Sequence, residues 1–347
     1  MEKTILDCIL LLVLGFFFLV KGSDLFVEGA SNVAKKMKIP TIIIGLTLVS
    51  LGTSAPELSA SINSAIINDS NMNFGNVVGS NIFNLLVVIG ASSLFVPLII
   101  SKQILKYDLP ILLGIYGLLA LFTMVISPNE LVLWESIVIL ILAIVYTVFL
   151  ILRNKKEIQE EKAKPIDENL QASKKNKWWK NILFIVIGLA GIIGGGRVVV
   201  DNAKQIAEFF KVDSLIIGLT IVAIGTSLPE LVTSIVAAKK GENDIAVANV
   251  VGSNIFNVLL ILSSSAIINN VMHKPLEVAK NPNFIDLAFM AFTTILFKNS
   301  SAFSILFVSI QSECFVPYLL IWLIASSKSL FVKFLAFALR PYLVPAI

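Results

Sequence analysis

The stretch "GLTLVSLGTSAPELSASI", residues 45–62, places a glycine, hydroxyls, a proline and a carboxylate within apolar sequence. It recurs at residues 218–235 as "GLTIVAIGTSLPELVTSI", with 12 of the 18 aligned positions identical. At the same offset of 173 residues, "NVVGSNIFNLL" (76–86) recurs as "NVVGSNIFNVL" (249–259). Two such matches at one offset indicate that the chain is an internal duplication.

The composition predicts an integral membrane protein. Of the 347 residues, 56% are hydrophobic and only 14% are charged, and the mean hydropathy is +0.89. A soluble domain carries roughly 25% charged residues. Several stretches, such as residues 131–152, reach the length of about 20 apolar residues that spans a bilayer. The net charge of +4 comes from lysines in loops and does not indicate nucleic-acid binding.

Apolar and charged segments divide the chain. The apolar segments are 4–33, 39–66, 75–97, 108–127, 131–152, 181–209, 213–238, 245–270 and 283–297. The first continues past Val20 without a small-residue cleavage site, so we expect a retained helix and not a signal peptide. The charged stretch 153–180 predicts a solvated linker. We therefore expect a first repeat at 1–152 and a second at 181–347, in which 297–347 is atypical.

An odd number of helices in each half predicts that the two repeats are inverted relative to each other in the membrane. If each half holds five helices, with the last span near 302–325, the second half enters the membrane from the opposite side. The expected fold is thus all-α, with about ten transmembrane helices. One side of the membrane then receives the linker and most short-loop lysines: Lys35, Lys36, Lys38, Lys102, Lys106, Lys239 and Lys240. The positive-inside rule places the linker in the cytoplasm and the N-terminus outside, in the cell (inner) membrane.

Pro56 predicts a break in the second helix. Its ring removes the hydrogen bond to the carbonyl of Gly52 and crowds that group. Carbonyls of the preceding turn, such as those of Ser50 and Thr53, are then expected to lack intrahelical partners. Such a break persists in a membrane only inside protein or beside a water-lined cavity. Free carbonyls are ligands for hard cations such as Na⁺ and Ca²⁺. The second half repeats the arrangement with Pro229, Gly225, Ala223 and Thr226.

The side chains of the same motif also predict a site. Thr53 and Ser54 precede Glu57 by four and three residues, so the three share one helical face. An ionisable residue at membrane depth is a functional-site hypothesis by default. One such motif alone also fits a purely structural kink, but its duplication with a second glutamate favours a site. The repeated residues are Thr226, Ser227 and Glu230.

The second motif adds hydroxyl and amide oxygens. Ser80 and Asn84 are four residues apart, as are Ser253 and Asn257. Asn81 and Asn254 are expected nearby, and Gly79 and Gly252 are expected to let helices approach closely. No histidine or cysteine joins these motifs, which disfavours soft metals. Cys8 and Cys314 suggest no disulfide framework, and we expect His273 to be a loop residue.

At these residues the sequence resembles the sodium/calcium exchanger family. The resemblance rests on "GTSAPEL" and "GTSLPEL", each followed by "GSNIFN", and extends to about residue 297. It implies ten helices with four ion sites between helices 2, 3, 7 and 8. It further implies that Glu57 and Glu230 are central ligands for Ca²⁺ and Na⁺, joined by Asn84 and Asn257. Carbonyl ligands would come from Thr53, Thr226, Ser50 and Ala223, and hydroxyls for flanking Na⁺ from Ser54, Ser80, Ser227 and Ser253.

The function that the resemblance implies is Ca²⁺ extrusion in exchange for Na⁺ by alternating access. Some family members carry an aspartate where this chain has Asn257, which leaves Ca²⁺/H⁺ or K⁺-dependent exchange as alternatives. A passive cation channel is a further alternative, which inverted repeats with broken helices disfavour. No nucleophile–base pair or cofactor motif is present, so we expect neither an enzyme nor a cofactor. Expected partners are the two ions and the lipid bilayer, and we expect a monomer.

Overall fold

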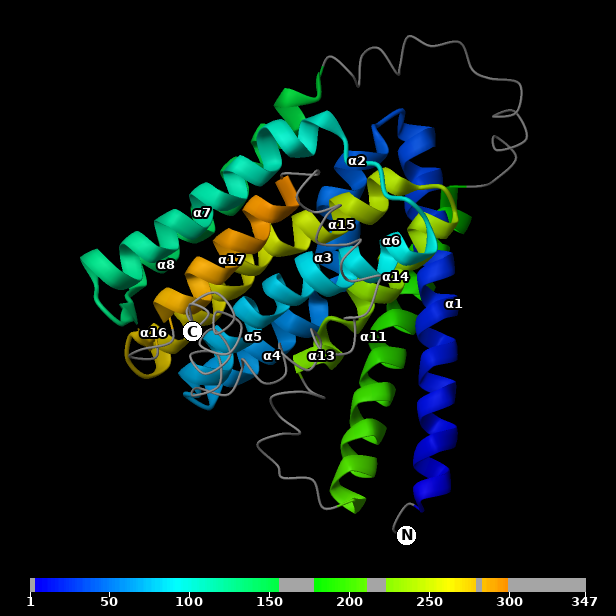
Figure 1. Ribbon diagram of the computed structural model, residues 1–347, viewed down its shortest axis with the longest axis horizontal. Helices are drawn as coiled ribbons and strands as arrows, with labels where there is room; N and C mark the ends of the chain where they lie inside the picture. The colour runs from blue at the N-terminus through cyan, green and yellow to red at the C-terminus, as the bar shows by residue number, and fades with distance from the viewer. Residues whose placement is uncertain (1–3, 156–177, 211–222, 279–282, 299–347) are drawn as a thin grey trace, which may run out of the picture.

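The computed structural model describes residues 4–155, 178–210, 223–278 and 283–298, and it is almost entirely helical (Figure 1). Five successive runs of helix make up the first half, some of them interrupted by π-helical turns, labelled η. These are α1 (Ile5–Met37); α2 (Thr41–Ile44), η1 (Gly45–Val49), α3 (Ser50–Thr53) and α4 (Ala55–Ile66); α5 (Ser70–Phe83), η2 (Asn84–Val88) and α6 (Ile89–Phe95); η3 (Ile104–Asp108), α7 (Leu109–Leu121) and η4 (Phe122–Ile126); and α8 (Leu133–Arg153).

The second half begins with one long helix and continues in the same order. Its described elements are α11 (Trp178–Phe209); α13 (Ala223–Thr226) and α14 (Leu228–Lys239); α15 (Asn243–Phe256), η6 (Asn257–Leu262) and α16 (Ser263–Met272); and α17 (Asn283–Lys298). Most of the predicted linker, the start of the segment 213–238 and the tenth span expected near 302–325 lie outside the described residues.

Length and composition of these helices confirm the prediction of an all-α integral membrane protein. Within the described residues, six helices are long and apolar enough to cross a membrane. A further candidate is the pair 41–53 and 55–66, which is bent by 47°. The sequence did not predict one small feature, the antiparallel pairing of β1 (Glu130–Leu131) with β2 (Leu276–Glu277). These two-residue strands join the loop before α8 to the loop after α16.

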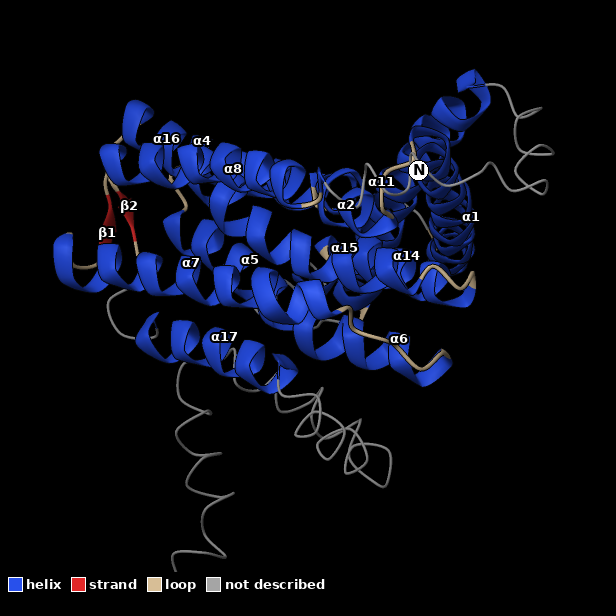
Figure 2. Cartoon of the chain, turned by 90° about the horizontal axis from the view of Figure 1, so that it is seen from above, coloured by secondary structure: helices blue, strands red, loops and turns tan. Residues whose placement is uncertain are grey.

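Helix α15 forms the centre of the bundle. Every residue from Ile245 to Phe256 is buried. Figure 2 shows α15 between the helices α4, α8 and α16 on one side and α6 and α17 on the other. In a helix that is buried on all faces, polar side chains are stable only where they have hydrogen-bond partners. Helix α15 contains the second "GSNIFN" motif, so its polar residues lie in the interior of the bundle.

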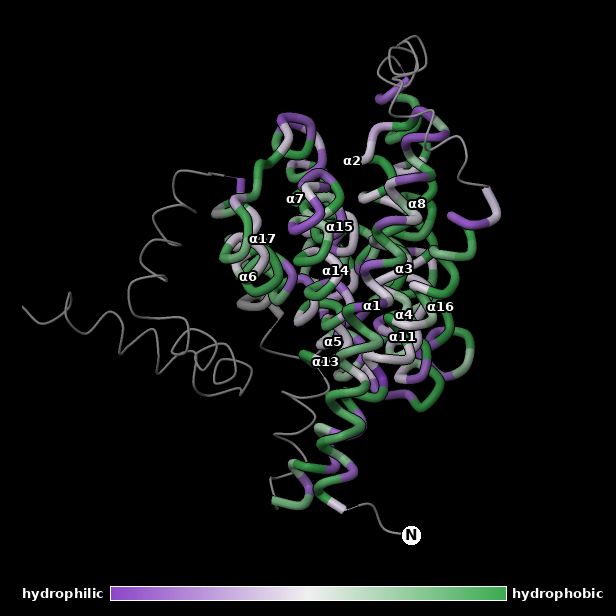
Figure 3. The backbone as a smooth tube through the Cα atoms, turned by 90° about the vertical axis from the view of Figure 1, so that its right-hand side faces the viewer, coloured by the Kyte–Doolittle hydropathy of each residue, from purple (hydrophilic) through white to green (hydrophobic). Residues whose placement is uncertain are grey.

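Helices α1 and α11 lie side by side at one edge of the bundle (Figure 1). Glycines make their close contact possible. A Cβ atom on Gly22 would lie 2.7 Å from the carbonyl oxygen of Gly188, and one on Gly195 would lie 2.8 Å from that of Gly15. Helix α1 also carries exposed apolar side chains, for example Leu6 and Leu10, as expected for a lipid-facing helix. Figure 3 shows that much of this helix is hydrophobic.

Charged residues tie α1 to the turn between α14 and α15. Lys240 Nζ lies 3.5 Å from Asp24 and 3.7 Å from Glu28, and Lys35 Nζ lies 2.8 Å from Glu242 Oε1. All three ion pairs are partially exposed. They join the first long helix to the helices that carry the repeated motifs.

We predict that Gly188→Ala destabilises the protein by about 1–3 kcal/mol, as overpacking does elsewhere. The added Cβ would lie 2.5 Å from the backbone nitrogen of Phe26, so α1 and α11 must move apart. Gly194→Ala is the matched control, because within the described residues no atom of another element lies within 4 Å of its Cβ position. Thermal unfolding in detergent should show a lower Tm for Gly188→Ala only. Equal Tm values for the two variants would contradict the packing argument.

Candidate cation-binding site

Both repeated proline motifs break their helices, as predicted. Helix α3 ends at Thr53 and α4 begins at Ala55, so Ser54 lies between them with φ −81° and ψ 9°. In the second half, α13 ends at Thr226 and Ser227 has nearly the same backbone angles, φ −91° and ψ 4°. In each half the proline stands in the first turn of the next helix, where its missing N–H is tolerated.

One expected consequence of the break is wrong. The carbonyl of Ser50 does have an intrahelical partner, because the backbone N–H of Ser54 donates to it at 3.0 Å. The hydroxyl of Thr53 also lies 3.3 Å from the same carbonyl oxygen. Pro56 removes the hydrogen bond of its own turn and leaves the preceding turn intact. Ser50 therefore contributes a carbonyl that already accepts hydrogen bonds, and its role as an ion ligand stays a prediction.

Serines cross from each repeat to the glutamate of the other. Ser54 Oγ donates to Glu230 Oε1 at 2.8 Å, and Ser227 Oγ lies 3.2 Å from Glu57 Oε1. Both glutamates are fully buried. Residue spacing predicts that each serine shares a helical face with the glutamate of its own motif. In the structure each serine instead contacts the glutamate of the opposite repeat. The break explains the difference, since Ser54 and Ser227 precede the helices on which Glu57 and Glu230 lie.

The predicted serines of the second motif join the same cluster. Ser80 Oγ lies 3.1 Å from Ser227 Oγ. Ser253 Oγ lies 3.3 Å from Glu230 Oε1 and 3.5 Å from the carbonyl oxygen of Ser50. Hydroxyl groups from the two breaks and from two helices, α5 and α15, thus surround the two carboxylates.

Two pairs of asparagines hold the predicted amide ligands in a fixed orientation. Asn84 Nδ2 donates to Asn254 Oδ1 at 3.0 Å, and Asn257 Nδ2 donates to Asn81 Oδ1 at 2.9 Å. Asn81 and Asn254 also exchange side-chain-to-backbone hydrogen bonds with each other, at 3.1 and 2.9 Å. The Nδ2 groups of Asn84 and Asn257 are thus hydrogen-bonded to neighbouring asparagines. The Oδ1 atom of each of these two side chains lies on the other side of the amide and takes no part in these bonds.

Four oxygens of this cluster are buried and have no hydrogen-bond donor within the described part of the chain. They are Glu57 Oε2, Glu230 Oε2, Asn84 Oδ1 and Asn257 Oδ1. Two come from each repeat, and all four are acceptors. Buried acceptors without donors are unfavourable unless a cation meets them, and carboxylate and amide oxygens are the ligands that hard cations prefer. The donor set therefore fits an alkali or alkaline-earth cation.

The threonines of the proline motifs lie beside asparagines that the sequence reasoning missed. Thr53 Oγ1 lies 3.0 Å from Asn249 Oδ1, and Thr226 Oγ1 lies 3.4 Å from Asn76 Oδ1. A signal for these residues was present, because Asn76 and Asn249 begin the repeated stretch "NVVGSNIFN". The remaining predicted ligand, Ala223, begins α13, and the proposed contribution of its carbonyl stays a prediction.

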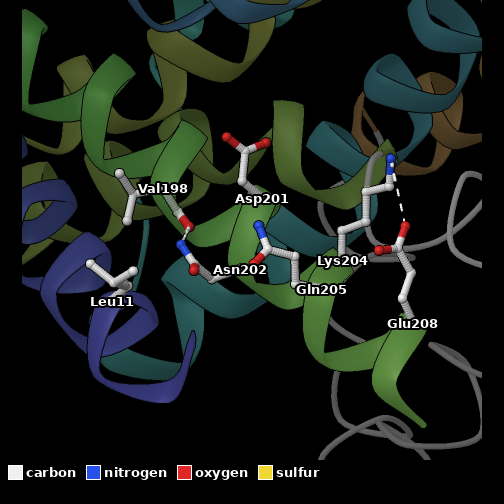
Figure 4. Close-up of a pocket in the computed structure, with 7 residues that line it drawn as sticks. All are labelled: Leu11, Val198, Asp201, Asn202, Lys204, Gln205 and Glu208. Atoms are coloured by element: carbon white, nitrogen blue, oxygen red, sulfur yellow. Dashed lines mark hydrogen bonds and ion pairs between the residues drawn. The ribbon is translucent and has the colours of Figure 1, made fainter. Parts of the chain in front are cut away.

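Other polar features lie away from this cluster. His273 Nε2 lies 2.9 Å from the carbonyl oxygen of Ile66 at the end of α4. A cavity of about 460 Å³ lies between Leu11 of α1 and the α11 residues from Val198 to Glu208 (Figure 4). None of the predicted ion ligands lines this cavity. Gly79 was expected to allow close helix contact. No atom of another described element lies within 4 Å of its Cβ position, but residues 211–222 lie outside the described part of the chain, so that expectation stays a prediction.

The sequence pattern of the family described as sodium/calcium exchanger protein matches residues 8–152 and 180–339. The chain belongs to the sodium/calcium exchanger family. The match covers both repeats and leaves out most of the charged segment between them. It also extends to residue 339, beyond the point near 297 where we expected the resemblance to end.

Individual members of the sodium/calcium exchanger family resemble the chain over most of its length. It is 32% identical to the inner membrane protein YrbG of Escherichia coli strain K12, over 84% of this chain and 89% of that protein. It is 35% identical to the sodium/calcium exchanger MaX1 of Methanosarcina acetivorans, over 86% of this chain and 91% of that protein. A solved structure of the exchanger NCX_Mj, soaked with Na⁺ and Sr²⁺, has a TM-score of 0.72 at 25% identity and covers 90% of this chain and 99% of that one.

We predict that Ser54→Ala and Ser227→Ala destabilise this exchanger-family protein by similar amounts in ion-free buffer. Each variant removes a hydroxyl beside a buried carboxylate, and a hydrogen bond to a charged group is worth about 1.5–3 kcal/mol. Ser64→Ala is the control, because the Ser64 hydroxyl donates to the carbonyl of Ala60 in its own helix. Thermal unfolding in detergent measures the effect. If the two variants unfold at the temperature of Ser64→Ala, the serine–glutamate contacts across the repeats are not stabilising.

Proposed function

We propose that the chain is an antiporter that exports Ca²⁺ in exchange for Na⁺. Membership of the sodium/calcium exchanger family supports cation exchange. The observation that carries the proposal is the set of four buried acceptor oxygens, two from each repeat, that have no donor within the described residues. A cation between them would satisfy two carboxylates and two amide carbonyls together. A cation site needs only acceptor oxygens. A site for a neutral polar solute would present hydrogen-bond donors as well.

In this proposal the two glutamates are shared by both ions. Glu57 and Glu230 carry two negative charges into a fully buried position. One Ca²⁺ or two Na⁺ would balance these charges, and burial of uncompensated carboxylates is strongly unfavourable. Because Ca²⁺ and Na⁺ require the same carboxylates, occupancy by one ion excludes the other. Exchange follows if the loaded site permits the change of access and the uncompensated site opposes it.

The roles of the other ligands are those that the resemblance to the sodium/calcium exchanger family implies. Asn84 and Asn257 supply the amide oxygens of the central site. Hydroxyls of flanking Na⁺ sites come from Ser54, Ser80, Ser227 and Ser253, and main-chain carbonyls come from Thr53, Thr226, Ser50 and Ala223. The long helices α1 and α11 are the proposed moving gate. Their close contact through glycines along much of their length supports motion of the two as a single unit.

The proposed location is the cell (inner) membrane, with the N-terminus outside and the linker 153–180 in the cytoplasm. In this topology two inverted five-helix repeats, 1–152 and 181–347, act as a monomer. The lysine distribution supports the orientation. The similar protein from Escherichia coli is named as an inner membrane protein, which supports the choice of membrane.

We predict that Glu57→Gln and Glu230→Gln each reduce Na⁺-driven ⁴⁵Ca²⁺ uptake into proteoliposomes to background. Each change removes one of the two charges that balance Ca²⁺. Glu135→Gln is the matched control, since Glu135 is also fully buried but caps the first turn of α8 through the backbone N–H of Val132, at 3.0 Å. Its glutamine retains an acceptor oxygen, and uptake should persist. Normal uptake by either Glu57→Gln or Glu230→Gln would overturn the site assignment.

A second experiment distinguishes the counter-ions. ⁴⁵Ca²⁺ uptake is measured into proteoliposomes that contain Na⁺, K⁺ or a proton gradient. We expect uptake with internal Na⁺ alone. Uptake driven by protons would instead establish Ca²⁺/H⁺ exchange, and a requirement for K⁺ together with Na⁺ would establish K⁺-dependent exchange. Current that needs no counter-ion would identify a channel.

A further inference from the structure

Each broken helix is held by an asparagine from the opposite repeat. Thr53 is the last residue of α3, and its hydroxyl lies 3.0 Å from Asn249 Oδ1 on α15. Thr226 is the last residue of α13, and its hydroxyl lies 3.4 Å from Asn76 Oδ1 on α5. The two contacts are related by the offset of 173 residues, so the same arrangement occurs twice around the site.

Hydrogen bonds of their Nδ2 groups fix the orientation of the side-chain amides of Asn249 and Asn76. Asn249 Nδ2 donates to Ser234 Oγ at 3.0 Å, and the Ser234 hydroxyl donates to the carbonyl of Ala246 at 3.2 Å. Asn76 Nδ2 donates to Ser61 Oγ at 2.9 Å and to the backbone carbonyl of Glu57 at 3.2 Å. Since the amide nitrogen is engaged in both cases, the amide oxygen must face the threonine.

We propose that Asn76 and Asn249 are positioning residues that set the ion-binding geometry of the two broken turns. The inference rests on the proposed function, in which the backbone at Thr53 and Thr226 contributes ion ligands. Each proline removes a hydrogen bond between the turn before the break and the helix after it, so the orientation of that turn relative to the following helix is less constrained by the backbone. The asparagines supply a fixed partner at the last helical residue of each turn. Asn76 also holds the backbone of Glu57, so it ties one glutamate to the opposite break.

The geometry explains why the partner comes from the other repeat. A hydrogen bond within one repeat would fix Thr53 relative to its own glutamate, Glu57. The bond to Asn249 instead fixes Thr53 relative to the helix that follows Glu230 in the chain. The two hydrogen bonds between the repeats therefore fix the distance between the two halves of the site. Residues that orient ligands without binding the ion change metal affinity by about 10–100-fold in other proteins.

The test measures the concentration of Ca²⁺ at half-maximal uptake, K0.5, and the maximal rate in Na⁺-loaded proteoliposomes. We expect Asn76→Ala and Asn249→Ala to raise K0.5 by about tenfold, the lower end of that range, and to change the maximal rate by less than about twofold. Asn73→Ala is the matched control. Asn73 is fully buried, as Asn249 is, lies one turn before Asn76 on α5 and accepts a hydrogen bond from Ser265 at 2.8 Å, away from both breaks. Its K0.5 should equal that of the wild type.

A double-mutant cycle distinguishes positioning from general loss of packing. Thr53→Val removes the hydroxyl and should raise K0.5 as Asn249→Ala does, whereas Thr53→Ser keeps the hydroxyl and should restore the wild-type value. The variant Thr53→Val/Asn249→Ala should be no worse than either single variant, because one contact is lost in all three. Multiplicative effects in the double variant would overturn the proposal. If Asn249→Ala fails to fold, the comparison of Thr53→Val with Thr53→Ser decides in its place.

The outcomes separate this inference from the proposed function. If the wild-type protein shows no saturable Ca²⁺ uptake with Na⁺, both are overturned. If the wild type exchanges the ions while Asn76→Ala and Asn249→Ala behave like Asn73→Ala, only the positioning role is overturned. If both variants raise K0.5 and the control does not, the positioning role is supported.

Discussion

Two carboxylates, Glu57 and Glu230, buried within one helical bundle are the constraint on which the rest of the structure depends. Charge in such surroundings is unfavourable unless donors or cations surround it. The structure meets part of this need with serine hydroxyls, each from the opposite repeat. Those hydroxyls reach the carboxylates because the helices break at Ser54 and Ser227. The breaks are therefore part of the electrostatic arrangement of the interior, and the two repeats must meet where they occur.

Close backbone packing brings the second motif to the same place. A Cβ atom on Gly252 would lie 2.7 Å from the carbonyl oxygen of Leu46, so only glycine lets α15 pack this closely against η1 and α3. The next residue, Ser253, then reaches both Glu230 and the carbonyl of Ser50. The polar contacts around the site follow the two-fold relation of the repeats.

The sequence predicted the breaks and the residues around the carboxylates because both follow from local chemistry. Pro56 and Pro229 cannot stand in a regular helix interior, and a repeated glutamate in apolar sequence indicates a site. Contacts between the repeats could not be predicted in this way, since spacing along a helix reports only neighbours within that helix. Ser54 was therefore paired with Glu57 and not with Glu230. Asn76 was missed for the same reason, because its partner Thr226 lies 150 residues away in the chain.

The hydrogen bonds across the repeats also bear on how such a chain arose. A single repeat would hold one member of each pair, so the unit that existed before duplication needed a second copy to complete the site. The fused chain shows the later divergence. At equivalent positions Lys35 and Lys36 of the first repeat correspond to Glu208 and Phe209 of the second, and Ile66 and Ile67 correspond to Lys239 and Lys240. In the fused chain the charges of these loops could diverge, while the residues of the shared site stayed nearly identical because each is needed by its partner in the other half.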